Sequence, residues 1–105
     1  MEREISFSDD GEFLVAHLYE EIDHHTAKPQ REGIDEMLFR LCPSVLVLDF
    51  GRVRFMDSSG IGLIIGRAEI AKSLGCEVRI KSASERILRL IRLSGVEKIQ
   101  NITII

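Results

Sequence analysis

Two adjacent hydroxyl groups follow a carboxylate at the point where the sequence pattern becomes helical. The chain reads Asp-Ser-Ser-Gly at 57–60, and residues 61–74 repeat apolar side chains at the three- and four-residue spacing of a helix. Asp57 is a residue type that caps helices, and a first helical turn has unpaired N–H groups that favour an anion. A phosphate on Ser58 or Ser59 would find donors there, although Asp57 would repel it. It would add about −1.5 to −2 of charge, enough to alter a docking surface.

A buried strand precedes this helix. Residues 45–48 are a continuous apolar run rich in β-branched side chains, which is typical of a strand covered on both faces, and Asp49 ends it. Upstream, residues 4–8 and 13–18 flank an Asp-Asp-Gly turn and predict a hairpin. His17 lies in the second of these strands, and we interpret it as a core or edge histidine rather than a ligand.

The other elements alternate between helix and strand. Pro29 is expected in the first turn of a helix that ends before Pro43, with Ile34, Met37, Leu38 and Leu41 inward and Arg31, Glu32, Asp35 and Glu36 outward. Residues 77–81 alternate like a half-buried strand, and 82–85 have capping-box spacing before a helix that ends at 94–95. Residues 99–105 predict a last strand. The order predicts an α/β fold with a mixed, largely parallel sheet.

The segment VLDFGRVRFMDSSGIGLIIGR, with EIDHHTA upstream, closely resembles the STAS-domain anti-sigma factor antagonists, in particular their sporulation members. The resemblance covers nearly the whole chain, and FMDSSGIG at 55–62 is its most specific part. It implies a single STAS domain over 1–105, with four to five strands and helices mostly on one face. In that family the first serine after the aspartate is the phosphoacceptor. This implies Ser58, with Ser59 as the alternative.

The resemblance also implies a function. Unphosphorylated, the protein would bind an anti-sigma factor that is also a serine kinase and so release the sigma factor, which activates transcription. The kinase would bind the ATP and phosphorylate Ser58 to end the interaction, and a serine phosphatase would reset it. This implies a cytoplasmic bacterial regulator with no catalysis or cofactor of its own. The switch and partner surface is expected to comprise Asp23, His24, Asp57, Ser59, Gly60, Gly62, Leu63 and Arg67.

Two features depart from the family pattern or add to it. The family usually has glycine where Glu20 stands, so Glu20 is expected to reshape the loop before Asp23. The family commonly continues into a further helix, and without it the last strand would be less covered, which leaves open a weak homodimer.

On the central helix, Gly62 and Gly66 predict close packing, and we expect some exposure near Leu63 and Arg67.

Composition excludes several classes. A net charge of −3 argues against a general nucleic-acid binder or a binder of anionic membranes, and no apolar run is long enough to span a bilayer. Cys42 and Cys76 have no metal or redox spacing and favour a reducing compartment. His24 and His25 are adjacent, without a third ligand at zinc-like spacing, so no metal is expected.

Other functions remain as alternatives. One keeps the STAS fold in another signalling assembly, such as a stress-response regulator. Another is weak nucleotide binding at the Gly-rich helix start, although the dinucleotide and P-loop patterns are absent. An enzyme built on Ser58, Asp57 and a histidine is the least favoured, because the chain has no Gly-x-Ser-x-Gly elbow. The arginines of 86–92 are interpreted as a solvated face, with a role in binding a phosphate or an acidic partner as the minor alternative.

Overall fold

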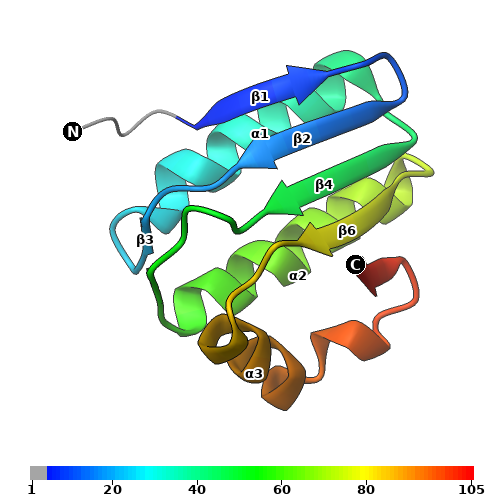
Figure 1. Cartoon of the computed structure of the whole chain (residues 1–105). Helices are drawn as coiled ribbons and strands as arrows, with labels where there is room; N and C mark the ends of the chain where they lie inside the picture. The colour runs from blue at the N-terminus through cyan, green and yellow to red at the C-terminus, as the bar shows by residue number, and fades with distance from the viewer. Residues whose placement is uncertain (1–4) are drawn as a thin grey trace.

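A five-stranded sheet organises the chain in the computed structural model, which describes residues 5–105 (Figure 1). Its spatial order is β1-β2-β4-β6-β7, and only β1 runs antiparallel to its neighbour. The strands are β1 (Ser6–Asp9), β2 (Phe13–His17), β4 (Val45–Asp49), β6 (Glu77–Lys81) and β7 (Ile102–Ile104). The predicted mixed, largely parallel sheet is therefore confirmed. Residue 4, expected in the first strand, lies outside the described residues.

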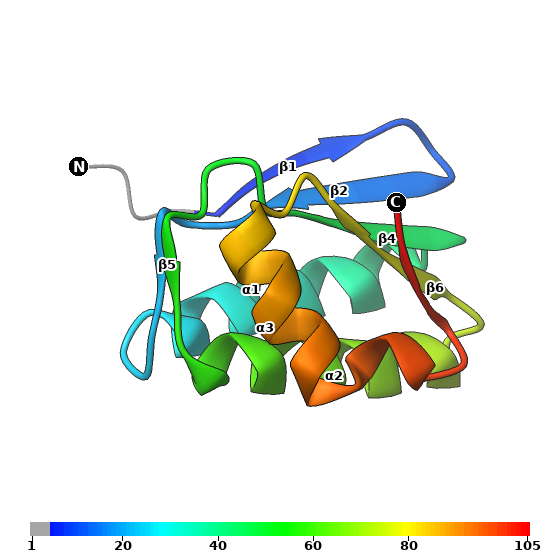
Figure 2. The same cartoon turned by 60° about the horizontal axis from the view of Figure 1, so that its bottom comes forward.

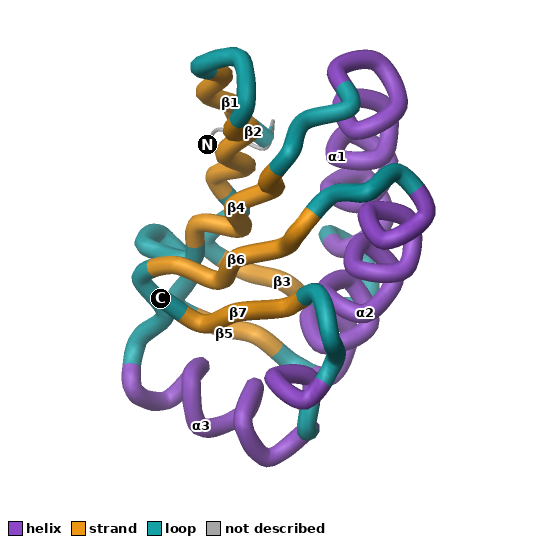
Figure 3. The backbone as a smooth tube through the Cα atoms, turned by 90° about the vertical axis from the view of Figure 1, so that its right-hand side faces the viewer, coloured by secondary structure: helices purple, strands orange, loops and turns teal. Residues whose placement is uncertain are grey.

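Helices cover one face of this sheet. Figures 2 and 3 show α1 (Ala27–Leu41) and α2 (Ser58–Ser73) side by side behind it, with α3 (Glu85–Ser94) packed at their side. A short 3₁₀ turn, η1 (Val96–Lys98), follows α3 and leads into β7. Among residues 5–105 no helix has the length and apolar character to cross a bilayer.

The burial of β4 explains why the sheet forms around it. Its residues from Val45 to Leu48 are all buried, because β4 is the middle strand of the five. β2 and β6 alternate instead, with Leu14 and Val78 fully buried and their neighbours in sequence less covered. The run of four apolar residues at 45–48 therefore correctly indicated the central strand.

Three local expectations were wrong. Leu41 is 37% exposed rather than inward, because α1 ends there and Cys42 turns the chain away with φ 43°. The cap of α3 is Ser84, whose hydroxyl accepts from the Ile87 N–H at 3.3 Å, and not Ser82, which has φ 62°. The last strand covers only Ile102–Ile104, because η1 takes up the residues just before the predicted segment and delays the strand.

Candidate functional site

Two strands of two residues each bring the candidate site together. β3 (Glu21–Ile22) pairs in parallel with β5 (Phe55–Met56), and Ile22 lies opposite Met56. The Asp57 N–H then donates to the Ile22 carbonyl at 3.1 Å. This pairing places the loop that starts at Asp23 directly beside the start of α2. The sequence did not predict these strands, although the resemblance implied that Asp23 and Asp57 belong to the same surface.

Glu20 fits this pairing without strain. Its carbonyl accepts from the N–H groups of Arg54 at 2.7 Å and Phe55 at 3.2 Å, which extends the contact between the two segments. Among the described residues other than glycine, only Cys42 and Ser82 have positive φ. Glu20 therefore replaces the family's usual glycine at a position where this chain needs no left-handed backbone.

Asp57 caps α2. Its Oδ1 accepts from the Ser59 N–H at 2.8 Å, and its carbonyl accepts from the Gly60 N–H at 3.0 Å. Two donors of the first turn thus already have acceptors, so the expectation of ready donors for a phosphate is met only in part. The structure makes Asp57 a cap, as predicted.

The two serines have different surroundings. Ser58 is exposed at the first position of α2, whereas Ser59 is half-buried. Ser59 lines a cavity of about 360 Å³ between the starts of α1 and α2, together with His24, Ala27, Arg31, Gly62 and Leu63. Of the two serines, Ser58 is therefore the more accessible from solvent. Arg31 was expected only to point outward, and nothing in its spacing indicated that it would lie near Ser59.

The loop before α1 is held in one conformation by its own side chains. Asp23 Oδ1 accepts from the N–H groups of His25 at 2.8 Å and Thr26 at 3.0 Å. Thr26 is buried, and its hydroxyl donates to the Glu21 carbonyl at 2.9 Å. The backbone N–H groups of Thr26 and His25 hold the pKa of Asp23 below its usual value. A negative charge is thus held in the loop that lies beside the start of α2.

Gly60 is required by close packing, whereas two other glycines of α2 are not. A Cβ on Gly60 would lie 2.2 Å from both Cγ and Sδ of Met56, far inside contact distance. At Gly62 and Gly66 a Cβ would meet no atom within 4 Å. The predicted tight packing of Gly62 and Gly66 is therefore wrong. Gly62 is exposed near Ser59 and Gly66 is half-buried farther along the helix.

The predicted exposure of Leu63 and Arg67 is also wrong. Leu63 is 2% exposed and Arg67 is 6% exposed, because α1 covers this side of α2. Arg67 Nε lies 2.7 Å from Asp35 Oδ1 on α1. Asp35 therefore faces α2, and the prediction that it points outward to solvent is wrong. Burial raises the pKa of the Asp35 carboxyl, although the Arg67 guanidinium opposes this. Arg67 therefore fastens the two helices together instead of forming a partner surface.

His24 and His25 lie side by side in the loop before α1. Their rings contact each other edge to face, with centroids 5.1 Å apart. Within residues 5–105 there is no group of three His, Cys, Asp or Glu side chains that could hold a metal ion. Neither histidine hydrogen-bonds to Ser58 in that part of the chain, and the Asp57 carboxylate is engaged with the Ser59 N–H. This arrangement does not support the serine-histidine-aspartate alternative.

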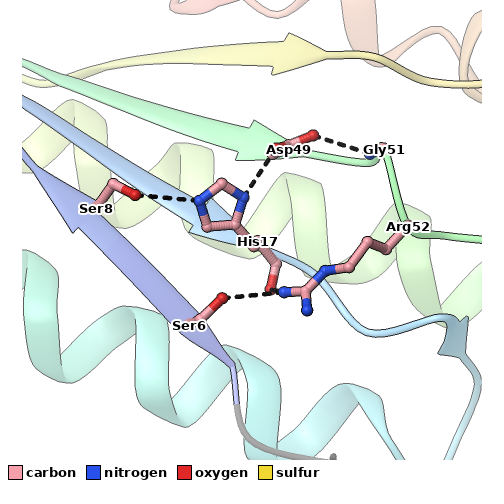
Figure 4. A network of polar contacts seen from close by, with 6 residues as sticks. All are labelled: Ser6, Ser8, His17, Asp49, Gly51 and Arg52. Carbon is pink, nitrogen blue, oxygen red and sulfur yellow. Dashed lines mark hydrogen bonds and ion pairs between the residues drawn. The ribbon is translucent and has the colours of Figure 1, made fainter.

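A second polar network ties the β4–β5 connection to the sheet (Figure 4). His17 Nδ1 lies 2.8 Å from Asp49 Oδ2, and His17 Nε2 lies 3.2 Å from the Ser8 hydroxyl, so the histidine joins β1, β2 and β4. Asp49 Oδ1 accepts from the Gly51 N–H at 2.8 Å, and Arg52 donates to the His17 carbonyl at 3.3 Å. The sequence predicted a core or edge histidine, and the structure places His17 half-buried at the end of β2, between β1 and β4. The network holds the segment that leads to β5 and Asp57.

Fold and site together define a small α/β domain with an exposed serine at the start of a capped helix. Residues 4–104 match the STAS domain model, and the chain belongs to this family. A curated relative, the anti-sigma F factor antagonist of Paenibacillus polymyxa, is 36% identical over 89 residues. The match covers 85% of this chain and 76% of the relative.

Two solved structures have the same fold. The chain resembles the anti-sigma factor antagonist SpoIIAA in its unphosphorylated form, with a TM-score of 0.81 and 24% identity, over 96% of this chain and 87% of SpoIIAA. It also resembles Bacillus SpoIIAA in the phosphorylated form, with a TM-score of 0.73 and 24% identity, over 96% and 90% of the two chains. The predicted STAS fold is confirmed by these likenesses.

Proposed function

We propose that this protein is an anti-sigma factor antagonist that phosphorylation of Ser58 switches off. Unphosphorylated, it binds an anti-sigma factor, which then releases its sigma factor, so that transcription increases. The observation that carries the proposal is the exposed hydroxyl of Ser58 at the start of α2, beside the Asp57 cap and the fixed Asp23 loop. The relative of the same family, an anti-sigma F factor antagonist, supports the choice of partner.

The charge of the site explains how a phosphate would act. Asp57 and Asp23 lie on neighbouring segments, and a phosphoserine would add about −1.5 to −2 beside them. Because the Ser59 and Gly60 N–H groups already have acceptors, this charge would remain at the surface. A partner surface that fits the neutral serine would then face a strongly negative patch. The domain would stay folded while the complex dissociates.

The remaining parts of the circuit complete the proposal. The anti-sigma factor is itself a serine kinase that binds the ATP, and a separate serine phosphatase removes the phosphate. The antagonist needs no cofactor, carries out no reaction, and works in the bacterial cytoplasm without binding DNA or a membrane. The switch surface comprises Asp23, His24, Asp57, Ser58, Ser59 and Gly62, and Leu63 lines the cavity beside Ser59. Gly60 is buried against Met56, so it supports this surface instead of forming part of it. The match with the P. polymyxa relative favours a sporulation circuit over a stress response.

A phosphorylation assay tests the proposal. The protein is incubated with Mg-ATP and the anti-sigma F factor that serves the P. polymyxa relative, and intact mass is measured for the wild type, Ser58→Ala and Ser59→Ala. One phosphate on the wild type and on Ser59→Ala, but none on Ser58→Ala, is expected. A phosphate lost only in Ser59→Ala would move the site by one residue. No phosphate on the wild type, together with no binding to the anti-sigma factor, would refute the proposal.

A further inference from the structure

The exposed side of α3 combines positive charge with an uncovered apolar side chain. The three arginines of this helix, Arg86, Arg89 and Arg92, are all exposed. The side chain of Leu93 is also uncovered, with an exposed fraction of 80%. Arg89 and Leu93 are four residues apart, so their side chains are neighbours on the helix. A hollow of about 510 Å³ lies on this side of the helix, lined by Glu85, Leu88, Arg89, Arg92 and Leu93.

The positive charge of α3 is largely unpaired and contrasts with the rest of the chain. The helix has three arginines and one glutamate, whereas the whole chain has a net charge of −3. Within residues 5–105 neither Arg86 nor Arg89 forms an ion pair, and Arg92 only approaches Glu97 at 4.0 Å. Arginine is enriched at protein interfaces, and the exposed leucine beside it adds apolar area that a partner can cover.

The position of α3 connects this surface with the switch. Figures 1, 2 and 3 agree in placing α3 on the side of the molecule where β5 leads into α2. A standard protein interface buries roughly 800 Å² of each partner, which corresponds to a patch about 30 Å across. The domain itself measures 33 × 30 × 20 Å. An interface of this size that is centred on Ser58 is large enough to reach α3.

We infer that α3 is a second docking surface for the same anti-sigma factor, and that it receives an acidic face with one apolar side chain. The inference rests on the proposed function and adds the chemistry of the partner. Carboxylates of the partner would pair with Arg86 and Arg89, and its apolar side chain would enter the hollow beside Leu93. The arginines would speed association and make it sensitive to salt, whereas the phosphate on Ser58 controls whether the complex persists.

Matched charge reversals test this inference. Arg89→Glu is compared with Arg40→Glu, because Arg40 is an exposed arginine near the far end of α1 and the two changes alter the net charge equally. Affinity for the anti-sigma F factor is measured by calorimetry at low and physiological salt. We expect Arg89→Glu to weaken binding at least tenfold and to reduce its salt dependence, and Arg40→Glu to change it less than twofold.

An apolar pair of variants tests the hollow. Leu93→Ser should weaken binding at least fivefold, whereas Phe39→Ser, at an apolar residue 60% exposed on α1, should not. Circular dichroism and urea denaturation verify that each variant folds, and Arg86→Glu replaces Arg89→Glu if the latter unfolds. If the wild type binds and is phosphorylated but the α3 variants bind equally well, the inference alone is overturned. If the wild type does not bind, the proposed function fails and the inference with it.

Discussion

Replacing Gly60 with alanine should destabilise the domain, although alanine normally stabilises a helix. The added Cβ would lie 2.2 Å from Cγ and Sδ of Met56, which are not the free end of that side chain. Met56 is only 8% exposed and belongs to β5, so it has little room to move. Forcing a methyl group into such a site costs about 1–3 kcal/mol. The gain in helix propensity returns at most about 1 kcal/mol.

Because an approach of 2.2 Å is a severe overlap, we expect a cost in the upper part of this range, about 2–3 kcal/mol. The net result is then a loss of about 1–2 kcal/mol in the free energy of unfolding, measured by urea denaturation. Gly66→Ala is the matched control, because it lies in the same helix and its Cβ would meet no atom within 4 Å. Gly66→Ala should gain up to about 1 kcal/mol, since only the propensity changes. Each variant adds one methyl group to the same helix, so opposite changes in the free energy of unfolding would isolate the effect of the contact with Met56.

A double-mutant cycle checks the cause. Met56→Ala removes Cγ and Sδ, so Gly60→Ala should be neutral or stabilising in that background. A wild-type-like or raised stability of the single Gly60→Ala variant would refute the reasoning. The same conclusion would follow if Gly60→Ala cost as much with Met56→Ala as with the methionine present.

Three further predictions concern charges around the site. Asp57→Ala should lower the free energy of unfolding by about 1 kcal/mol, because the α2 cap is lost. Asp57→Asn should keep most of the capping stabilisation, and equal losses for the two variants in urea denaturation would contradict this. Asp35→Ala should lower the free energy of unfolding by about 3 kcal/mol, because it leaves the Arg67 charge buried without its carboxylate. Arg67→Met should lower it clearly less, and the reverse order in urea denaturation would refute the pairing. The fold lowers the pKa of Asp23, so the ionised carboxylate stabilises the folded state. Its contribution to the free energy of unfolding is complete above the pKa of 3.8 in the unfolded chain, and it is lost as the pH falls through the lower pKa in the folded state. The difference in unfolding free energy between wild type and Asp23→Asn should therefore be constant at neutral pH and shrink in acid, and a difference that grows below pH 3.8 would contradict the assignment.

Long, strongly patterned segments could be predicted from the sequence. The apolar run at 45–48, the turn at 9–11 and the helix after Asp57 are each determined by local residue types, and the structure has all three. β3 and β5 could not be found in this way, because a strand of two residues has no periodicity to detect. Their pairing is nevertheless what brings Asp23 beside Asp57.

The errors on α2 have a common physical cause. This helix is covered by the sheet on one side and by α1 on another, so its apolar residues do not form the single stripe of a surface helix. Exposure near Arg67 was expected because this residue lies only a few helical turns from Ser58 in the sequence. Its partner Asp35 lies on another helix, and no local pattern connects the two.

The most direct test of the account is the affinity for the anti-sigma factor before and after phosphorylation. Calorimetry would compare the unphosphorylated protein, the enzymatically phosphorylated protein, and Ser58→Ala carried through the same kinase treatment. Phosphorylation of the wild type should weaken binding at least a hundredfold, which corresponds to about 2.7 kcal/mol, while treated Ser58→Ala should bind as tightly as before. Equal affinities of the phosphorylated and unphosphorylated wild type would contradict the central claim that the charge on Ser58 controls the interaction.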